Sequence, residues 1–195
     1  MKSLEGTQTY QNLIKAFNGE LQTRSRYIFY GEIARKQGYP LIKKTFELTA
    51  KQEYMHGKVF LSYLKEEFNS KTFETKVNFP VDLYQEDTLE NLLASIELEA
   101  HEHEVTYPLF AKVAGEEGFS KIATTFDHIA EIEFKHSRRF AQLATELKEG
   151  TLFKKVEPVS WHCEICGHIH VGKSAPTLCA VCQHLKVYFI AEISQ

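Results

Sequence analysis

Two stretches of equal length decide the fold: FELTAKQEYMHGKVF at residues 46–60 and FDHIAEIEFKHSRRF at residues 126–140. Each contains a Glu-x-x-His pair, and five positions coincide at an offset of 80: Phe46/Phe126, Ala50/Ala130, Glu53/Glu133, His56/His136 and Phe60/Phe140. Because residues three apart in a helix lie on one face, each Glu is expected beside its His. The flanking phenylalanines indicate that this face is buried. The two stretches therefore predict related helices that carry Glu and His into a core.

The segments that precede these helices repeat as well. Asn-Leu-Ile at residues 12–14, with Glu20 after it, matches Asn-Leu-Leu at residues 91–93, with Glu99 after it. The offset here is 79, and a duplicated helical hairpin explains both offsets. Glu20 shares a helical stripe with apolar side chains, so its face is also predicted to be buried. Each of four helices is therefore expected to place one carboxylate in the core.

Four helices are predicted, over about residues 7–37, 40–68, 87–115 and 120–150. Asp87 and Glu90 have capping-box spacing, and Pro108 predicts a kink in the third helix. Short turns join the first helix to the second and the third to the fourth, so each pair should form an antiparallel hairpin. About 18 residues, 69–86, separate the hairpins and are long enough for a crossover. Residues 1–150 are therefore predicted to form an all-α, ferritin-like four-helix bundle with one long crossover; an ordinary up-down bundle with a loose middle loop is the alternative.

Carboxylates at equivalent depth on four apolar helix faces require a compensating charge. Ionised carboxylates packed into a low-dielectric core would repel one another and take up protons. Metal cations remove that problem, and one Glu from each of two helices plus Glu-x-x-His from the other two is the ligand set of di-iron and di-manganese bundles. Glu102, one turn after Glu99, faces the same site, whereas the repeat has Thr23 there. The predicted ligands are Glu20, Glu53, His56, Glu99, Glu102, Glu133 and His136; ordinary surface glutamates and core histidines are the alternative.

The composition excludes several other classes of protein. The chain has 195 residues, 23 basic and 26 acidic side chains, and a net charge of −3. This balance argues against a nucleic-acid-binding protein, which needs a basic face. The sequence lacks an apolar stretch near the roughly 20 residues that span a bilayer, and residues 1–10 lack the apolar core of a signal peptide. We therefore expect a soluble cytoplasmic protein without a nucleic-acid or membrane partner.

All four cysteines lie in a second segment, residues 151–195, which is predicted to be a small domain with short strands. Cys163 and Cys166 form one Cys-x-x-Cys pair, and Cys179 and Cys182 form another. This spacing predicts a tetrahedral site of four thiolates. A reducing cytosol favours metal ligands over two disulfides, which are the alternative. Four thiolates can bind either a structural zinc or an iron that carries one electron, so both metals remain candidates.

Several motifs resemble those of the rubrerythrin family, and the likeness spans essentially the whole chain. They are Ala-Phe-Asn-Gly-Glu at residues 16–20, Gln-Glu-Tyr-Met-His at 52–56, Glu99 to Glu102 followed by Tyr107-Pro108, Glu133 to His136, and Trp-His-Cys at 161–163. The resemblance implies a ferritin-like bundle with a C-terminal rubredoxin-like domain. It further implies a non-haem di-iron peroxidase that reduces hydrogen peroxide to water in protection against oxidative stress. The alternative is a ferritin-like ferroxidase or iron-handling protein with a structural zinc ribbon.

The resemblance also implies how the iron pair is bound. Glu53 and Glu133 would bridge two non-haem irons, which an oxo or hydroxo group joins when they are oxidised. Glu20 would bind the first iron. Glu99 and His136 would bind the second. Each of these positions matches the family motif residue by residue.

The resemblance also implies a change of ligand on the first iron and hydrogen bonds that hold the ligands in place. Glu102 in the oxidised state and His56 in the reduced state would alternate as ligands of the first iron. Tyr27 and Tyr107 would hydrogen-bond to ligand carboxylates. A single rubredoxin-type iron, for which zinc is the alternative, would be held by the four thiolates of Cys163, Cys166, Cys179 and Cys182.

The implied reaction needs partners beyond hydrogen peroxide. The four-cysteine iron would pass electrons to the iron pair and would itself be reloaded by an external donor. Rubredoxin or an NAD(P)H-dependent reductase is the kind of donor that the resemblance implies. In dimers of this family, the cysteine domain of one subunit approaches the iron pair of the other. A homodimer or a larger assembly is therefore expected.

Overall fold

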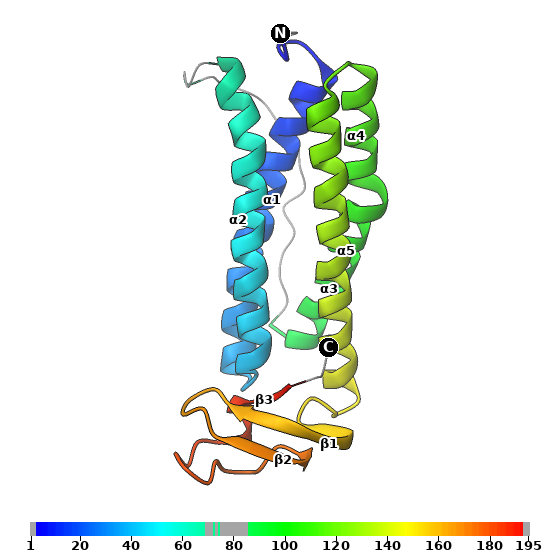
Figure 1. Cartoon of the computed structure of the whole chain (residues 1–195). Coiled ribbons are helices and arrows are strands. Elements are labelled where there is room, and N and C mark those ends of the chain that lie inside the picture. The colour runs from blue at the N-terminus through cyan, green and yellow to red at the C-terminus, as the bar shows by residue number, and fades with distance from the viewer. Residues whose placement is uncertain (1–2, 69–71, 73, 75–85, 193–195) are drawn as a thin grey trace.

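The computed structural model describes residues 3–68, 72, 74 and 86–192. Long helices run side by side, and a small three-stranded sheet lies across one end of them (Figure 1). The helical elements are α1 (Gln8–Lys36), α2 (Pro40–Phe68), α3 (Thr88–His101), the π-helical turn η1 (Glu102–Thr106), α4 (Tyr107–Glu116) and α5 (Ser120–Lys148). The predicted ferritin-like bundle is confirmed, and the crossover predicted over residues 69–86 falls almost wholly outside the described residues. No helix within the described ranges is long and apolar enough to cross a membrane.

Each hairpin turns at a glycine with a left-handed backbone. Gly38 follows α1 with a φ of 86°, and Gly118 follows α4 with a φ of 82°. Just beyond the first glycine, the backbone N–H of Tyr39 donates to the carbonyl of Ala34 at 2.8 Å, and an equivalent bond closes the second turn. A side chain at either glycine would be strained, because positive φ is disfavoured for other residues. The two short hairpins predicted from the sequence are therefore formed.

The turn of each hairpin caps the first helix of the other hairpin. Gln37, in the turn between α1 and α2, accepts a hydrogen bond from the backbone N–H of Thr88 (3.0 Å) at the start of α3. Glu117, in the turn between α4 and α5, accepts from the backbone N–H groups of Gln8 (3.0 Å) and Thr9 (2.8 Å) at the start of α1. These caps satisfy donors that a helix leaves free at its start. The repeat therefore extends to the contacts that join the two hairpins.

The third predicted helix is interrupted rather than only kinked. The backbone N–H of Tyr107 donates to the carbonyl of Glu102, five residues earlier, and Pro108 follows without an N–H to donate. A π turn holds one residue more than an α-helical turn. Before it, Glu20 and Glu99 match at an offset of 79, and after it the helices match at an offset of 80. The π turn is therefore the one-residue insertion that separates the two offsets.

Two apolar clusters fill the bundle on either side of a polar layer. One contains Phe60 and Phe126, and the other contains Phe46 and Phe140; in each pair the ring centroids are 5.1 Å apart. All four phenylalanines are fully buried, as the repeat predicts. Burying a side chain of this size stabilises the fold by about 1.5–3 kcal/mol. Because they stand seven residues from the glutamates of the layer, or about 10 Å along the helix, they close it at both ends.

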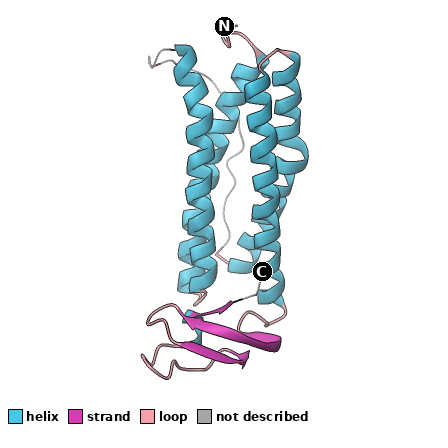
Figure 2. Cartoon of the chain, in the orientation of Figure 1, coloured by secondary structure: helices cyan, strands magenta, loops and turns pink. Residues whose placement is uncertain are grey.

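The C-terminal segment forms a small antiparallel sheet beneath the bundle (Figure 2). Its strands are β1 (Lys154–Cys163), β2 (Ile169–Ser174) and β3 (Phe189–Glu192), in the order β2-β1-β3, with a short 3₁₀ turn, η2 (Lys186–Tyr188), before β3. Trp161 is fully buried at the centre of this segment, and its Nε1 donates to the carbonyl of Gly172 at 2.8 Å. One large aromatic side chain with a satisfied N–H thus organises a core that is too small to be built from aliphatic residues alone.

Ion pairs join the sheet segment to the bundle. Lys155 pairs with Glu146 near the end of α5 at 2.6 Å, and Lys44 of α2 pairs with Glu164 beside the first cysteine. The predicted boundary between domains 1–150 and 151–195 falls in the short connection between α5 and β1. It stays a prediction.

Replacing Glu117 by Ala should lower the free energy of unfolding by about 1–2 kcal/mol, because two backbone donors at the start of α1 lose their acceptor. Urea unfolding of both proteins in the same metal state measures the difference. The neighbouring Glu116→Ala is the matched control, since among the described residues Glu116 forms only an exposed pair with Lys112 at 3.9 Å. That control should change stability by less than about 0.5 kcal/mol. Equal effects of the two variants would contradict the capping role.

Candidate metal centre

Six of the seven predicted ligands converge in the layer between the two apolar clusters. They come from four helices and are nearly or fully buried: Glu20 from α1, Glu53 and His56 from α2, Glu99 from α3, and Glu133 and His136 from α5. They form two groups of four side chains, and the ligand atoms of each group all lie within 4.8 Å of one another. Glu53 and Glu133 belong to both groups. Two cation sites that share two carboxylates would require this arrangement.

The first group is completed by Glu20 and His56. Nδ1 of His56 lies 2.9 Å from Glu53, 3.0 Å from Glu133 and 3.7 Å from Glu20. The absence of a side chain at Gly57 lets α1 approach α2 here, because a Cβ at that position would lie 3.3 Å from the Cβ of Glu20. Three carboxylates thus surround one ring nitrogen from three different helices.

The second group is completed by Glu99 and His136, and it is more enclosed. Nδ1 of His136 lies 2.8 Å from Glu133, 3.0 Å from Glu53 and 3.3 Å from Glu99. His136 has no exposed surface, whereas His56 retains 7%. The same ring nitrogen therefore faces the carboxylates in both groups, but only one of the two rings reaches solvent.

The layer contains buried polar atoms that lack a hydrogen-bond partner among the described residues. They are both histidine Nδ1 atoms and carboxylate oxygens of Glu53, Glu99 and Glu133. Each unsatisfied buried atom of this kind costs about 1–3 kcal/mol, so native cores contain few of them. Carboxylate oxygen and imidazole nitrogen are ligands that iron and related transition metals accept. The donor set therefore fits a pair of transition-metal ions.

Tyr27 and Tyr107 hydrogen-bond to carboxylates of the layer from opposite hairpins. Tyr27 on α1 donates to Glu99 on α3, and Tyr107 on α4 donates to Glu20 on α1. Burial, followed by the charge of the neighbouring carboxylates, raises the pKa of both phenols. Both tyrosines therefore keep their hydroxyl protons at neutral pH and remain donors. These are the contacts that the resemblance implies for the two residues.

Glu102, the seventh predicted ligand, joins neither group. It occupies the first position of η1 and is only partly buried. Desolvation raises the pKa of its carboxyl group, and the charges of Glu20 and Glu99 raise that pKa further, so Glu102 lies within electrostatic reach of the layer. The group that contains Glu20 includes His56 and does not include Glu102.

Protons take the place of metal charge in the metal-free cluster. Burial raises the pKa of Glu99 to about 8. Burial alone would lower the pKa of His136, but its contacts with Glu133, Glu53 and Glu99 raise that pKa to about 11. Glu133 differs, because burial acts to raise its pKa while contacts with His136 and His56 lower it to about 2. Without metal, the folded cluster therefore retains extra protons near neutral pH.

Two residues that contact the centre are not predicted by the sequence analysis. Oε1 of Gln52 lies 3.0 Å from Nε2 of His136 and 3.2 Å from Nη1 of Arg139. Both residues are partly exposed polar side chains on a helix, a type of residue that does not by itself indicate a role. Gln52 belongs to the motif at residues 52–56, but the motif does not show that its side chain contacts His136. The repeat also fails at both positions, since Ile132 and Val59 are their equivalents at the offset of 80.

The four cysteines also converge, where β1 ends. All four are free thiols, with Sγ of Cys163 3.7 Å from that of Cys182, and Sγ of Cys166 3.6 Å from that of Cys179. A disulfide needs about 2.05 Å, so the disulfide alternative does not fit. A tetrahedral site with metal–sulfur bonds of about 2.3 Å has sulfur–sulfur edges of about 3.8 Å, close to those observed. A backbone hydrogen bond from Cys182, assisted by one from Val181, lowers the pKa of Cys179 to about 6, which favours the thiolate.

Comparison with known proteins covers both the bundle and the cysteine segment. A family profile described as Rubrerythrin matches residues 11–144, and one described as the rubredoxin-like domain of rubrerythrin matches residues 161–190. The chain belongs to the rubrerythrin family. It is 44% identical over 189 residues to the rubrerythrin of Clostridium perfringens, with 97% of this chain and 96% of that protein covered.

Solved structures of related proteins share the architecture. Fully reduced, all-ferrous nigerythrin superposes with a TM-score of 0.64 at 26% identity, over 98% of this chain and 92% of that one. The bacterioferritin of Desulfovibrio desulfuricans, a protein with a diiron site, superposes with a TM-score of 0.62 over 72% of this chain and 80% of that one. At 21% identity, the second likeness shows the fold alone, which is the ferritin-like bundle.

Membership of the rubrerythrin family assigns metals to the two donor sets. A pair of non-haem irons in the bundle and a single iron in the four-cysteine site are its cofactors, and both donor sets fit them. Zinc would also satisfy four thiolates. The chain is therefore a di-iron protein with a rubredoxin-like metal site, in a family of oxidoreductases associated with oxidative stress.

The metal-free protein should lose stability as the pH rises from about 5 to about 9. Between pH 4.5 and about 8 the folded state keeps a proton on Glu99 that the unfolded state releases, and between 6.5 and about 11 the same holds for His136. When the folded state binds more protons, the free energy of unfolding falls with rising pH. The lowered pKa of Glu133 acts in the opposite direction only below pH 4.5. Urea midpoints of the metal-free protein across this range measure the trend.

The iron-loaded protein is the control for this experiment. Its ligands must be deprotonated to bind metal, so the added stability from iron should increase over the same pH range. A midpoint of the metal-free protein that stays level or rises with pH would contradict the protonated cluster.

Proposed function

We propose that the protein reduces hydrogen peroxide to water at a di-iron site in the bundle. The observation that carries the proposal is that two buried ligand groups share Glu53 and Glu133. When bound, the iron pair supplies the two electrons that, with two protons, convert hydrogen peroxide to two waters, and the four-cysteine iron supplies their replacements one at a time. The chain's own residues supply geometry, charge balance and exclusion of bulk water.

Each ligand has a proposed role that follows from its group. Glu53 and Glu133 would be ligands of both irons, because each belongs to both groups. Glu20 would bind the first iron. Glu99 and His136 would bind the second, and the full burial of His136 supports its role as a fixed ligand.

His56 and Glu102 are proposed to alternate on the first iron. His56 lies beside Glu20, and Glu102 lies outside both groups. We assign this arrangement to the reduced pair. Charge balance supplies a reason for the exchange. Four carboxylates neutralise two ferrous ions, whereas an oxidised pair carries more charge and favours a fifth carboxylate.

The residues around the ligands are proposed to hold them in place. Tyr27 donates to Glu99, and Tyr107 donates to Glu20. Each hydrogen bond occupies one oxygen of the carboxylate that accepts it and restricts the orientation of that carboxylate. The phenylalanine pairs above and below the layer exclude bulk water, which strengthens electrostatic interactions within it.

The cysteine site is proposed to serve a second copy of this chain in a homodimer or larger assembly. Pro40, at the end of α2 nearest the sheet, is 13 residues from Glu53, which is about 20 Å along the helix. Because electron transfer slows steeply with distance, a route within one chain is unfavourable. Ile165 and Val181, next to cysteines, are 47% and 67% exposed and offer an apolar contact surface.

Electrons are proposed to enter from outside through this same site. A rubredoxin or an NAD(P)H-dependent reductase is the proposed donor, since Cys166 is exposed and a donor could approach it. The cytoplasm is the proposed location, because a reducing compartment keeps four thiols available for metal.

Glu133→Ala should lower peroxide turnover by more than about 100-fold, because both ligand groups lose a shared carboxylate. Anaerobic consumption of peroxide by the chemically reduced protein measures this directly. Glu131→Ala, two residues earlier on the exposed face of α5, is the matched control and should retain full turnover. Full activity of the Glu133 variant, with its helical circular dichroism unchanged, would refute the assignment of the site.

The metal in the four-cysteine site should be visible by eye. A ferric tetrathiolate is red and bleaches on reduction, so the protein purified with iron should show both properties. Cys179→Ser should remove the colour, because a thiolate of lowered pKa is lost from the metal. Protein that remains colourless, with zinc found by metal analysis, would argue against an electron relay and for a structural zinc ribbon.

A further inference from the structure

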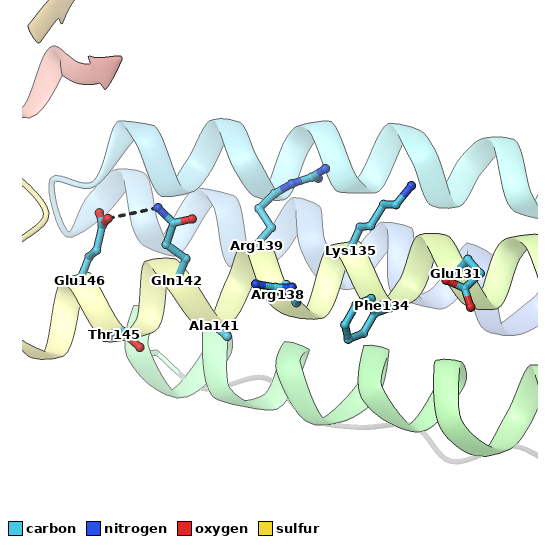
Figure 3. A pocket seen from close by; sticks show the side chains of 9 residues that line it. All are labelled: Glu131, Phe134, Lys135, Arg138, Arg139, Ala141, Gln142, Thr145 and Glu146. Carbon is cyan, nitrogen blue, oxygen red and sulfur yellow. Dashed lines mark hydrogen bonds between the residues drawn. The ribbon is translucent and has the colours of Figure 1, made fainter. Parts of the chain in front are cut away.

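A chain of polar side chains links α5 to α2 beside the second ligand group. Arg139 lies at an open groove along α5, and its guanidinium extends toward α2 (Figure 3). Nη1 of Arg139 is 3.2 Å from Oγ1 of Thr49 and 3.2 Å from Oε1 of Gln52. The same oxygen of Gln52 is 3.0 Å from Nε2 of His136. One amide oxygen thus lies between a cation and the ring of a ligand.

The arginine determines the direction of every hydrogen bond in this chain. A guanidinium only donates, so Gln52 must present its carbonyl oxygen to it. Thr49 likewise accepts from the arginine, and its own hydroxyl donates to the carbonyl of Thr45 at 3.0 Å. Because Oε1 of Gln52 can only accept, the proton of its bond with His136 is on Nε2. The neutral ring then has its lone pair on Nδ1, the nitrogen that faces the carboxylates.

The first ligand group, around His56, has no equivalent of this chain of side chains. At the offset of 80, the positions that correspond to Thr49, Gln52 and Arg139 are all apolar: Ile129, Ile132 and Val59. Side chains of this kind offer no acceptor to the ring of His56. The ligand layer is therefore symmetric in its carboxylates and asymmetric in what supports its two histidines.

We propose that Gln52, oriented by Arg139, is a positioning residue that keeps His136 a permanent iron ligand through Nδ1. The lack of a counterpart in the other hairpin leaves His56 free to exchange with Glu102. This inference rests on the proposed di-iron function and supplies a reason why one histidine stays and the other leaves. Metal-binding histidines generally donate their other N–H to a fixed acceptor, and loss of that acceptor weakens metal binding about 10–100-fold.

Gln52→Leu removes the acceptor while keeping the size of the side chain similar. The metal-free bundle, with its cysteine site filled by Zn²⁺, is titrated anaerobically with Co²⁺, whose absorption reports its ligands. We expect one of the two ions to bind about 10–100-fold more weakly than in the wild type, and the other to bind unchanged. Ile132→Leu, at the equivalent position of the other hairpin, is the matched control and should bind both ions as the wild type does.

Gln52→Glu retains an acceptor and distinguishes positioning from packing. It should restore the affinity lost in Gln52→Leu. A carboxylate accepts a stronger hydrogen bond than an amide, so His136 should remain a ligand in this variant. If residue 52 only filled space, the Leu and Glu variants would bind both ions equally well.

The outcomes separate this inference from the function on which it rests. If the wild type binds two ions in the bundle and Gln52→Leu binds both equally well, the positioning role is wrong and the di-iron function stands. If the wild type binds no pair of ions, the proposed function itself is wrong, and the inference with it. Unchanged helical circular dichroism, together with rescue by Gln52→Glu, excludes misfolding as the cause of weakened binding.

Discussion

Four carboxylates buried at one level of a helical bundle are the constraint on which the rest of the structure depends. Each would cost several kcal/mol if left charged and unpaired in a dry core. Protons retained on groups such as Glu99 and His136 relieve that cost without metal, and two divalent cations, with a charge equal and opposite to four carboxylates, relieve it fully. The long helices, the aromatic clusters at both ends of the layer and the reciprocal caps at the turns all keep these groups together.

The duplicated hairpin explains the frame, and the departures from its symmetry explain the chemistry. Both tyrosines, all four phenylalanines and both capping turns obey the repeat. One inserted residue forms the π turn, whose first residue is Glu102, and the other hairpin has Thr23 at the position that matches Glu102. A second departure, at Gln52 and Arg139, supports only one of the two histidines. The proposed exchange of His56 with Glu102, and the proposed retention of His136, would require such a difference between the two halves of the site.

Much of the fold and of the site could be predicted because helical periodicity converts spacing into direction. Residues three, four and seven apart share a face, so Glu53 with His56, and the phenylalanines around them, identify buried helix faces without any structure. The π turn could not be predicted in the same way. The change of offset from 79 to 80 shows that one residue is added between Glu99 and the last helix. The sequence does not show at which position the extra residue is accommodated. Pro108 indicates a disturbance, and only the hydrogen bonds of the folded chain place it at Glu102–Thr106.

Residue types and their spacing were thus sufficient to predict the helices, six of the side chains that meet in the buried layer, and the convergence of the four cysteines. All of these depend on positions within one helix or one short knuckle. The contacts between helices depend on how each helix is rotated and shifted against its neighbours. Packing of the whole core sets these relations, and no local pattern encodes them. For that reason, only the tertiary structure decided that Tyr27 reaches Glu99, that His56 and not Glu102 stands beside Glu20, and that Gln52 meets Arg139.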